Sequence, residues 1–307
     1  MEIIRDLKGF TPRPHPVVAL GNFDGVHIGH RAILREAIER ARASGGTAFA
    51  LTFDPLPARR LFPDRAPAAL VTLDDKLALL GALGLDGAIV IDFTLELSRV
   101  SARDFVHDYI LGRIGARTVV VGHSVSFGHK RAGNAAAMVA MGREFGFDTV
   151  VAGPVTAAGI EVSSTRIREL IGAGDMRLAA QLLGRNHFLS GVVVHGRERG
   201  RGLGFPTANL ASETECLPPD GVYATRVMLA DRAWPSVSNI GTNPTFNESA
   251  RTVEAHIFDF DRDLYGARLR LEFVERIRGE VKFDSGDALA RQIAADLMRA
   301  REILASA

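Results

Sequence analysis

The chain has 307 residues, of which 47% are hydrophobic and 24% charged, and its formal net charge is +1. This length allows one large domain or two ordinary ones, and the composition is typical of a folded soluble protein. The near-neutral charge gives no electrostatic reason to expect nucleic acid or an anionic membrane as a partner. A single cysteine, Cys216, excludes a disulfide within the chain and disfavours a cysteine-based zinc site.

The first sixteen residues mix charges with prolines, which is typical of neither a signal peptide nor a membrane span. No later apolar run approaches the roughly 20 residues that a spanning helix needs. We therefore expect a cytoplasmic protein with no membrane partner.

Apolar runs and helical stretches alternate in the first half of the chain. The runs are short and rich in Val and Ile, and they cover 16–20, 47–53, 87–93, 117–122 and 147–153. Helical spacing follows Gly29 up to Gly45 and recurs over 73–84 and 101–115, where Ser101 is a plausible N-cap. Continuous apolar strands between helices predict an α/β unit with a parallel sheet that is covered on both faces.

The second half of the chain has a different pattern of predicted elements. Its strand-like segments are separated by Gly, Pro, Asn and Asp rather than by helices, and they cover 188–196, 221–229, 233–241, 252–260 and 267–277. This pattern predicts an antiparallel sheet or barrel. A final helix is predicted over 284–305, capped by Asp284 or Ser285. We place the domain boundary close to Gly184, which gives domains 1–183 and 184–307.

The stretch "ALGNFDGVHIGHRAIL" (19–34) runs from a strand through a turn into a helix. His27 and His30 therefore lie at a helix N-terminus on the C-terminal edge of the sheet, where open α/β sheets bind ligands. Unpaired N–H groups and the helix dipole favour phosphate there. In the alternative interpretation, one histidine caps the helix and the other faces solvent. A metal site is disfavoured because no third ligand is nearby.

The turn itself supplies further candidates for contact with a nucleotide. Gly21, Gly25 and Gly29 allow the backbone to approach a ligand closely. Phe23 and Asp24 lie between them and complete the predicted phosphate-binding turn.

A second polar stretch, "VSSTRIREL" (162–170), follows the last predicted parallel strand. Ser163, Ser164 and Thr165 are typical of a helix cap. Arg168 and its neighbour Arg166 lie in the first turn, where cations oppose the helix dipole unless an anion is bound nearby. Together with the histidine turn, this stretch indicates the other end of a triphosphate site.

The stretch "HGRERGRGLGFPTANL" (195–210) contains a basic glycine loop that includes Gly196, Gly202 and Gly204. It lacks the Gly-Lys-Ser/Thr of a Walker loop. Thr207 and Asn209 are oxygen donors two residues apart on one side of an extended chain, which suits Mg²⁺ bound to substrate phosphates. The alternative is a hairpin turn with a solvated basic rim.

One acidic residue is a candidate general base. Glu254 lies in "TVEAHIFDFDRDLYG" (252–266) and shares a strand face with His256 and Phe258. From spacing alone, a surface carboxylate on a half-exposed strand is the more ordinary interpretation.

Several of these motifs together resemble a known family. "GNFDGVHIGH" and "SSTRIR" resemble the nucleotidylyltransferase superfamily, and within it the adenylyltransferase half of bacterial bifunctional riboflavin kinase/FAD synthetases. "GVVVHGRERGRGLGFPTANL", "GVYA", "NIGTNPTF", "VEAHIFDFDRDLYG" and "IRGEVKFDSGDALARQI" follow the order of riboflavin kinase modules and span most of 191–293.

The resemblance implies roles for these residues. His27 and His30 would stabilise phosphate charge as FMN attacks ATP, and Ser163, Ser164, Thr165 and Arg168 would hold the leaving pyrophosphate. In a six-stranded barrel, Thr207 and Asn209 would bind Mg-ATP, Glu254 would take the proton of the riboflavin 5′-hydroxyl, and the C-terminal helix would flank the isoalloxazine ring. The implied ligands are riboflavin, FMN, ATP and Mg²⁺.

Two loops depart from the family pattern, in which Phe-x-Pro-His-Pro and an acid or amide followed by an aromatic residue are usual. This chain has Leu56 in the first loop, and Ser124 and Val125 in the second. An alternative is therefore a monofunctional riboflavin kinase with an impaired nucleotide-binding half. A flavin-binding regulatory protein without turnover is a more distant alternative.

Overall fold

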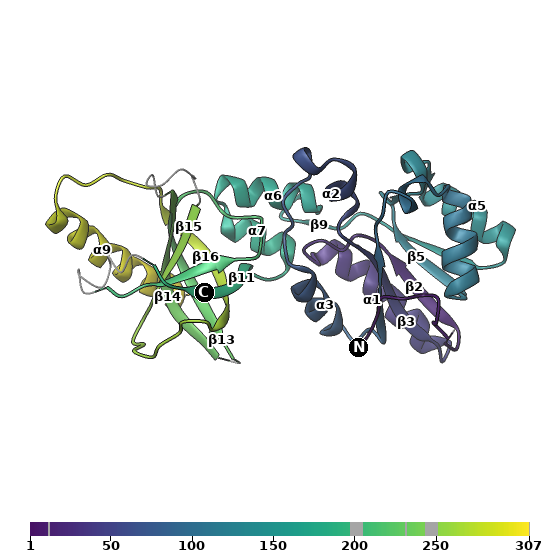
Figure 1. Cartoon of the computed structure of the whole chain (residues 1–307), viewed down its shortest axis with the longest axis horizontal. Coiled ribbons are helices and arrows are strands. Elements are labelled where there is room, and N and C mark those ends of the chain that lie inside the picture. Colours follow the sequence, from purple (N-terminus) through teal and green to yellow (C-terminus); the bar gives the residue numbers. More distant parts are fainter. Residues whose placement is uncertain (12, 197–204, 231, 243–250, 307) are drawn as a thin grey trace. The chain divides into compact units, whose positions relative to one another are not determined.

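The computed structural model describes residues 1–11, 13–196, 205–230, 232–242 and 251–306. Contacts divide the chain into two compact units (Figure 1). The first consists of Met1–Ala68 with Leu73–Ser163, and the second of Ala69–Thr72 with Ser164–Ala307.

The first unit is built on a parallel sheet of six strands in the order β1-β4-β3-β2-β5-β8. The strands are β1 (Glu2–Ile4), β2 (Pro16–Leu20), β3 (Thr47–Asp54), β4 (Gly87–Asp92), β5 (Thr118–Gly122) and β8 (Asp148–Ala152). The predicted α/β class is confirmed. The chain runs outward from β2 to β4 and then returns to β5, so the strand order reverses between β2 and β5. Ligands bind at such a switch point, beyond the carboxyl ends of the strands.

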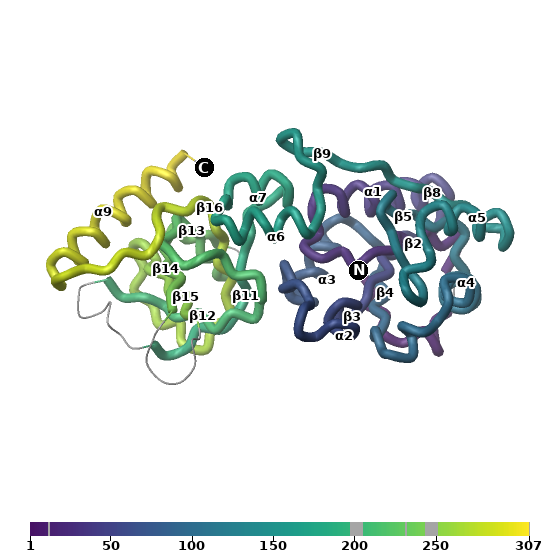
Figure 2. The backbone as a smooth tube through the Cα atoms, turned by 90° about the horizontal axis from the view of Figure 1, so that it is seen from above, coloured from purple at the N-terminus to yellow at the C-terminus, as the bar shows by residue number. Residues whose placement is uncertain are grey.

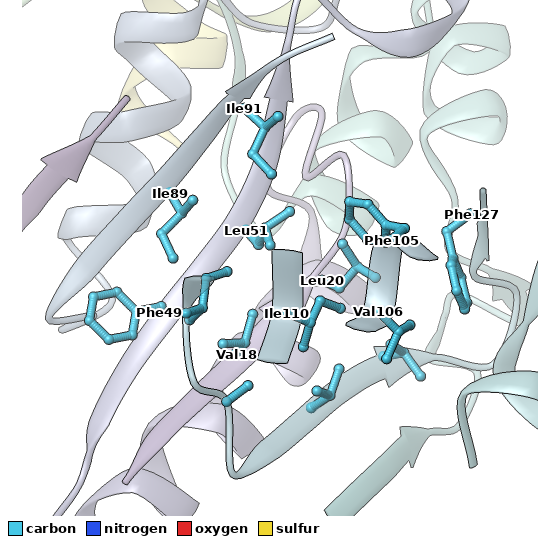
Figure 3. Close-up of a cluster of buried hydrophobic side chains, with 14 of the residues drawn as sticks. Val18, Leu20, Phe49, Leu51, Ile89, Ile91, Phe105, Val106, Ile110 and Phe127 are labelled. Carbon is cyan, nitrogen blue, oxygen red and sulfur yellow. The ribbon is translucent and has the colours of Figure 1, made fainter. Parts of the chain in front are cut away.

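Both faces of this sheet are buried, as its apolar strands predict. Figure 3 shows Val18 and Leu20 of β2 on the face that packs against Phe105, Val106 and Ile110. The alternate β2 residues, Val17 and Ala19, point to the other face, where Leu34 and Leu77 cover them. Because side chains alternate between the two faces along β2, this strand packs against helical segments on both sides of the sheet.

The helical segments of the first unit lie between its strands. The longer ones are α1 (Ile28–Ala43), α3 (Leu73–Gly81), the π-helical η3 (Phe105–Arg113) and α5 (Ala135–Phe145). The shorter ones are α2 (Pro57–Leu61), η1 (Pro63–Arg65), η2 (Leu97–Arg99), α4 (Ala102–Asp104) and η4 (His129–Arg131). Two small hairpins pair β6 (Ser126–Phe127) with β7 (Gly133–Asn134) and β9 (Thr156–Ala157) with β10 (Ile160–Glu161).

The second unit contains a closed antiparallel barrel in the order β11-β12-β15-β14-β13-β16. Its strands are β11 (His187–Val194), β12 (Ala208–Ser212), β13 (Gly221–Leu229), β14 (Arg232–Thr242), β15 (Arg251–Ile257) and β16 (Arg268–Arg278). The predicted six-stranded barrel is confirmed.

The C-terminal helix α9 (Gly286–Ala305) lies along the outside of the barrel in both views (Figure 1, Figure 2). It begins at the predicted cap, because the Ser285 hydroxyl accepts a bond from the Ala288 N–H at 3.2 Å. Arg278 of the barrel donates to the buried Asp296 carboxylate of α9 at 2.7 Å. This paired charge fastens the helix to the barrel wall.

The two compact units divide the chain between Ser163 and Ser164, whereas the predicted boundary lies between residues 183 and 184. Helices α6 (Ser164–Ala173) and α7 (Met176–Leu183) belong to the barrel unit, and α7 packs against β11 and β16. Arg177 of α7 forms an ion pair with Glu275 of β16. The boundary between domains 1–183 and 184–307 itself stays a prediction.

Within the described parts of the chain, no helix is both long enough and apolar enough to span a membrane.

The barrel contains a buried histidine that makes its stability depend on pH. His187 is 1% exposed and its Nε2 lies 2.8 Å from the Cys216 carbonyl oxygen, so the neutral ring donates this bond. Burial lowers the pKa of His187 to about 4. Because the folded-state pKa lies below the unfolded value, the stabilisation is complete above about pH 6.5 and is lost as the pH falls toward 4.

We expect His187→Gln to flatten this part of the stability profile. The wild-type barrel should lose up to about 3 kcal/mol of unfolding free energy between pH 6.5 and 4 through this group, and the variant should lose correspondingly less. Trp234, the only tryptophan of the chain, lies in the barrel and reports its unfolding in denaturant. Parallel profiles for the two proteins would contradict the assignment.

Candidate functional site

The turn between β2 and α1 has an unusual backbone. Phe23, Gly25 and Val26 have φ angles of +49°, +82° and +42°. Left-handed backbone costs non-glycine residues about 1–3 kcal/mol each. The side chains of Phe23 and Val26 are 0% exposed and pack in the core beneath α1. Burial therefore holds the strained turn in one shape at the carboxyl end of the central strand.

His27 is the N-cap of α1, which confirms part of the capping interpretation. Its Nδ1 accepts a bond from the His30 backbone N–H at 3.2 Å. An Nδ1 that accepts carries no proton, so the neutral ring has its proton on Nε2. The cap thus fixes a tautomer whose other nitrogen is a donor.

His30 stacks on His27, with ring centroids 3.5 Å apart and an interplanar angle of 18°. The Phe23 ring also packs against His30, with ring centroids 5.4 Å apart and an interplanar angle of 84°. Burial lowers the pKa of His30 well below 6.5, and the neighbouring His27 and Lys76 lower it further. Its buried Nδ1 has no hydrogen-bond partner among the described residues. The structure therefore brings the two predicted histidines together, with His30 neutral.

The three glycines of the turn are needed for different structural reasons. Gly25 is required by its φ of +82°. A Cβ at Gly21 would lie 3.0 Å from the Phe23 ring, and a Cβ at Gly29 would lie 3.2 Å from the His27 ring. Gly21 and Gly29 thus leave room for the chain's own rings. Close approach of a ligand at these two positions stays a prediction. Asp24 is buried in the same turn.

Sequence reasoning missed one residue of this region, Lys76 of α3. Its side chain is 4% exposed, and its Nζ donates to the Asn22 carbonyl at 3.3 Å. In the sequence it lies in a predicted amphipathic helix, far from the histidine motif. The only indication in the sequence was that a lysine occupies a position where the helical pattern calls for an apolar residue.

The first departing loop contains the cis peptide bond Asp54–Pro55, and the second contains left-handed backbone at Lys130 and Arg131. Leu56 is the N-cap residue of α2 and makes no side-chain cap bond. Val125 is partly buried against the core of the sheet, whereas Ser124 is exposed.

The predicted pyrophosphate residues lie on both sides of the unit division. Ser163 belongs to the first unit, while Ser164, Thr165 and Arg168 begin α6 in the second. Within the first unit, a Cβ on Gly29 would lie 3.7 Å from the Val162 carbonyl oxygen. The chain therefore approaches the start of α1 directly before Ser163. The shared role of the four residues stays a prediction.

A second group of polar residues lies on the outer face of the barrel. Glu254 of β15 is opposite Asn209 of β12 on one side and Asn239 of β14 on the other. Residues opposite each other in a sheet point to the same face. The Thr207 hydroxyl donates a hydrogen bond to Glu254 Oε2, with an O···O distance of 3.2 Å. The predicted trio of Thr207, Asn209 and Glu254 is thus assembled by strand register.

Asn239 completes this group and was not predicted as a site residue. It lies in the "NIGTNPTF" stretch, but the pairing of β14 with β15 was needed to place it beside Glu254. Gly196, at the start of the glycine loop, lies directly against this group, because a Cβ on Gly196 would overlap the Asn209 amide. Gly202 and Gly204 lie outside the described residues.

A cavity of about 600 Å³ lies beside Thr207. Val193, Ala255 and Ile257 give it apolar walls, and Phe260 and Tyr265 are aromatic residues of its lining. Its size is typical of small-molecule sites. Pro206, which also lines it, is held by His256, whose Nδ1 lies 2.8 Å from the Pro206 carbonyl.

Fold and site together define a class of protein. An α/β unit with paired histidines at a helix start is joined in one chain to a small barrel with a carboxylate, a hydroxyl and two amides. This combination is typical of an enzyme with two phosphate-transfer sites.

Comparison with known proteins identifies the family. The riboflavin kinase family model matches residues 183–304, and the FAD synthetase family model matches residues 11–166. The chain is 36% identical to the bifunctional riboflavin kinase/FMN adenylyltransferase of Escherichia coli K12, over 98% of this chain and 97% of the relative. For the Pseudomonas fluorescens protein of the same name, the identity is 37% over 99% and 98%.

A crystal structure from Streptococcus pneumoniae, named a macrolide-efflux protein, has a TM-score of 0.89 with this chain. The two are 31% identical over 97% of this chain and 98% of the other. The chain belongs to the bifunctional riboflavin kinase/FMN adenylyltransferase family, and both of its halves match the corresponding family models.

The positive φ of the turn predicts a specific cost for Gly25→Ala. We expect this change to destabilise the first unit by about 1–2 kcal/mol, because alanine is strained at φ +82°. Gly153→Ala is the matched control, since Gly153 lies in the same unit with nothing within 4 Å of an added Cβ. Native-state hydrogen exchange of the β2 amides measures both effects. Equal effects of the two changes would show that the turn is not strained.

Proposed function

We propose that this chain phosphorylates riboflavin to FMN at the barrel and then adenylylates FMN to FAD at the histidine turn, with ATP as the second substrate of each step. The observation that carries this proposal is the presence of two polar groups, the paired histidines within residues 11–166 and the Glu254 group within residues 183–304, the ranges that the two family models match.

In the kinase step, Glu254 accepts the proton of the riboflavin 5′-hydroxyl. The hydroxyl oxygen then forms a bond to the γ-phosphorus of ATP, and ADP leaves. The bond from Thr207 to Glu254 Oε2 supports this role because it orients the carboxylate. The nearby cavity, with apolar walls and aromatic residues, suits the base and ribose of the nucleotide.

The kinase step also calls for Mg²⁺, which we assign to Thr207 and Asn209. Their side chains offer hard oxygen donors next to the Glu254 carboxylate, which is the donor chemistry that Mg²⁺ prefers. The bound ion would neutralise charge on the phosphates. Gly196 supports the arrangement, since it leaves the Asn209 amide the space that a Cβ would take.

In the adenylylation step, a phosphate oxygen of FMN forms a bond to the α-phosphorus of ATP, and pyrophosphate leaves. Charge builds up on the phosphate oxygens, so fixed donors placed in advance lower the barrier. His27, with its proton on Nε2, and the neutral His30 are such donors. The N-terminal N–H groups of α1 add to the positive potential. Ser163, Ser164, Thr165 and Arg168 are proposed to hold the pyrophosphate.

A glutamate variant tests the kinase site. We expect Glu254→Gln to lower riboflavin phosphorylation about 10²–10⁴-fold, the usual contribution of a general base. Formation of FAD from supplied FMN should be unchanged. Glu272→Gln, on β16 of the same barrel, is the control and should phosphorylate riboflavin normally. Wild-type kinase rates in Glu254→Gln would remove Glu254 from the mechanism.

A pair of histidine variants separates capping from catalysis. Serine is a good N-cap but has no imidazole. We expect His27→Ser to keep the helix start yet to lower FMN adenylylation about 10²–10³-fold, as His27→Ala does. Riboflavin phosphorylation should persist in both variants. Recovery of adenylylation in His27→Ser alone would show that His27 is only a cap.

A further inference from the structure

Lys76 presents an ammonium group inside the first unit. Its side chain is 4% exposed, although a buried ammonium is costly unless it is well paired. Its Nζ donates to the Asn22 carbonyl at 3.3 Å, to Thr52 Oγ1 at 3.3 Å and to the Phe53 carbonyl at 3.4 Å. These acceptors lie at the carboxyl ends of β2 and β3, the two strands that lead into the candidate site.

The hydrogen bonds form a closed network. The fully buried Thr52 donates its hydroxyl to the same Asn22 carbonyl at 2.9 Å. Asn22 is the residue directly before the strained Phe23. The network therefore fixes the point where the turn leaves the sheet.

The charge of Lys76 also acts on its surroundings. Burial lowers the pKa of Lys76, while the charges of Asp24 and Asp54 oppose this effect. On the other side, His27 and Lys76 are the charged or titratable groups that act on His30. The three acceptors of Lys76 are all neutral, so an uncharged donor could satisfy them. A cation at this position adds positive potential where phosphates are expected to bind.

We propose that Lys76 is a positioning residue for adenylyl transfer: its ammonium fixes the Asn22 and Phe53 carbonyls behind the turn and places a positive charge beside His30. This inference rests on the proposed adenylylation of FMN at the histidine turn. It assigns the charge, and not only the hydrogen bonds, a role in catalysis.

The pH profile of kcat/KM for FMN adenylylation distinguishes charge from packing, because it reports the ionisation of the free enzyme. Lys76→Met removes the charge at similar length. We expect it to lower kcat/KM about tenfold or more and to move the low-pH ionisation in the profile, which we assign to His30, upward, because His30 loses a neighbouring cation. Thr52→Val removes one hydrogen-bonding partner but keeps the charge, and it should leave this ionisation in place.

Two controls accompany these variants. Lys130→Met removes an exposed lysine of the same unit and should change neither rate nor profile. Riboflavin phosphorylation by each variant shows that the barrel unit is intact. An unmoved ionisation in Lys76→Met, or the same shift in Thr52→Val, would overturn the proposed role of the charge.

A second measurement does not depend on turnover. Histidine ring resonances in the wild-type chain, assigned with His30→Gln, should show His30 titrating below pH 6.5, and in Lys76→Met at a higher pH than in wild type. A wild-type His30 that titrates at or above 6.5 overturns the inference, even if Lys76→Met does not fold. If the wild type forms no FAD but His30 titrates at a higher pH in Lys76→Met, the proposed function fails, and of the inference only the electrostatic effect of Lys76 on His30 stands.

Discussion

The burial of Phe23 and Val26 is the constraint on which the first site depends. Both residues have left-handed backbone, and both side chains are completely enclosed by the core beneath α1. The core thus offsets the strain of a turn that could not hold this shape alone. Because the turn is fixed, His27 is held as the N-cap of α1, and the cap bond sets the tautomer of His27, on which His30 stacks.

The second site depends on register rather than strain. Glu254 has one neighbour on each adjoining strand, Asn209 and Asn239, and a shift of one residue would turn its side chain to the opposite face. Closure of the barrel holds this register. The paired histidines and the Glu254 group belong to different units. A change in one site is therefore expected to spare the chemistry of the other.

Much of the fold and of the two sites could be predicted from the sequence, because the structure of the segments that carry the motifs is determined by local patterns. The β2–turn–α1 segment, the barrel class and the Ser285 cap are all set by short-range periodicity and capping. What it missed depends on tertiary contacts. β1 is three residues long and gains its pairing only beside β4. Asn239 and Lys76 reach their sites through strand pairing and helix packing, which no local pattern records.

The central claim is that one chain carries two working sites in sequence. The most direct measurement is a time course of the purified wild-type chain with riboflavin and Mg-ATP, in which FMN, FAD, ADP and pyrophosphate are separated and quantified. We expect FMN to form first, with one ADP released for each FMN. FAD should follow, with one pyrophosphate released for each FAD. Accumulation of FMN without any FAD or pyrophosphate, even when FMN is supplied in excess, would contradict the central claim.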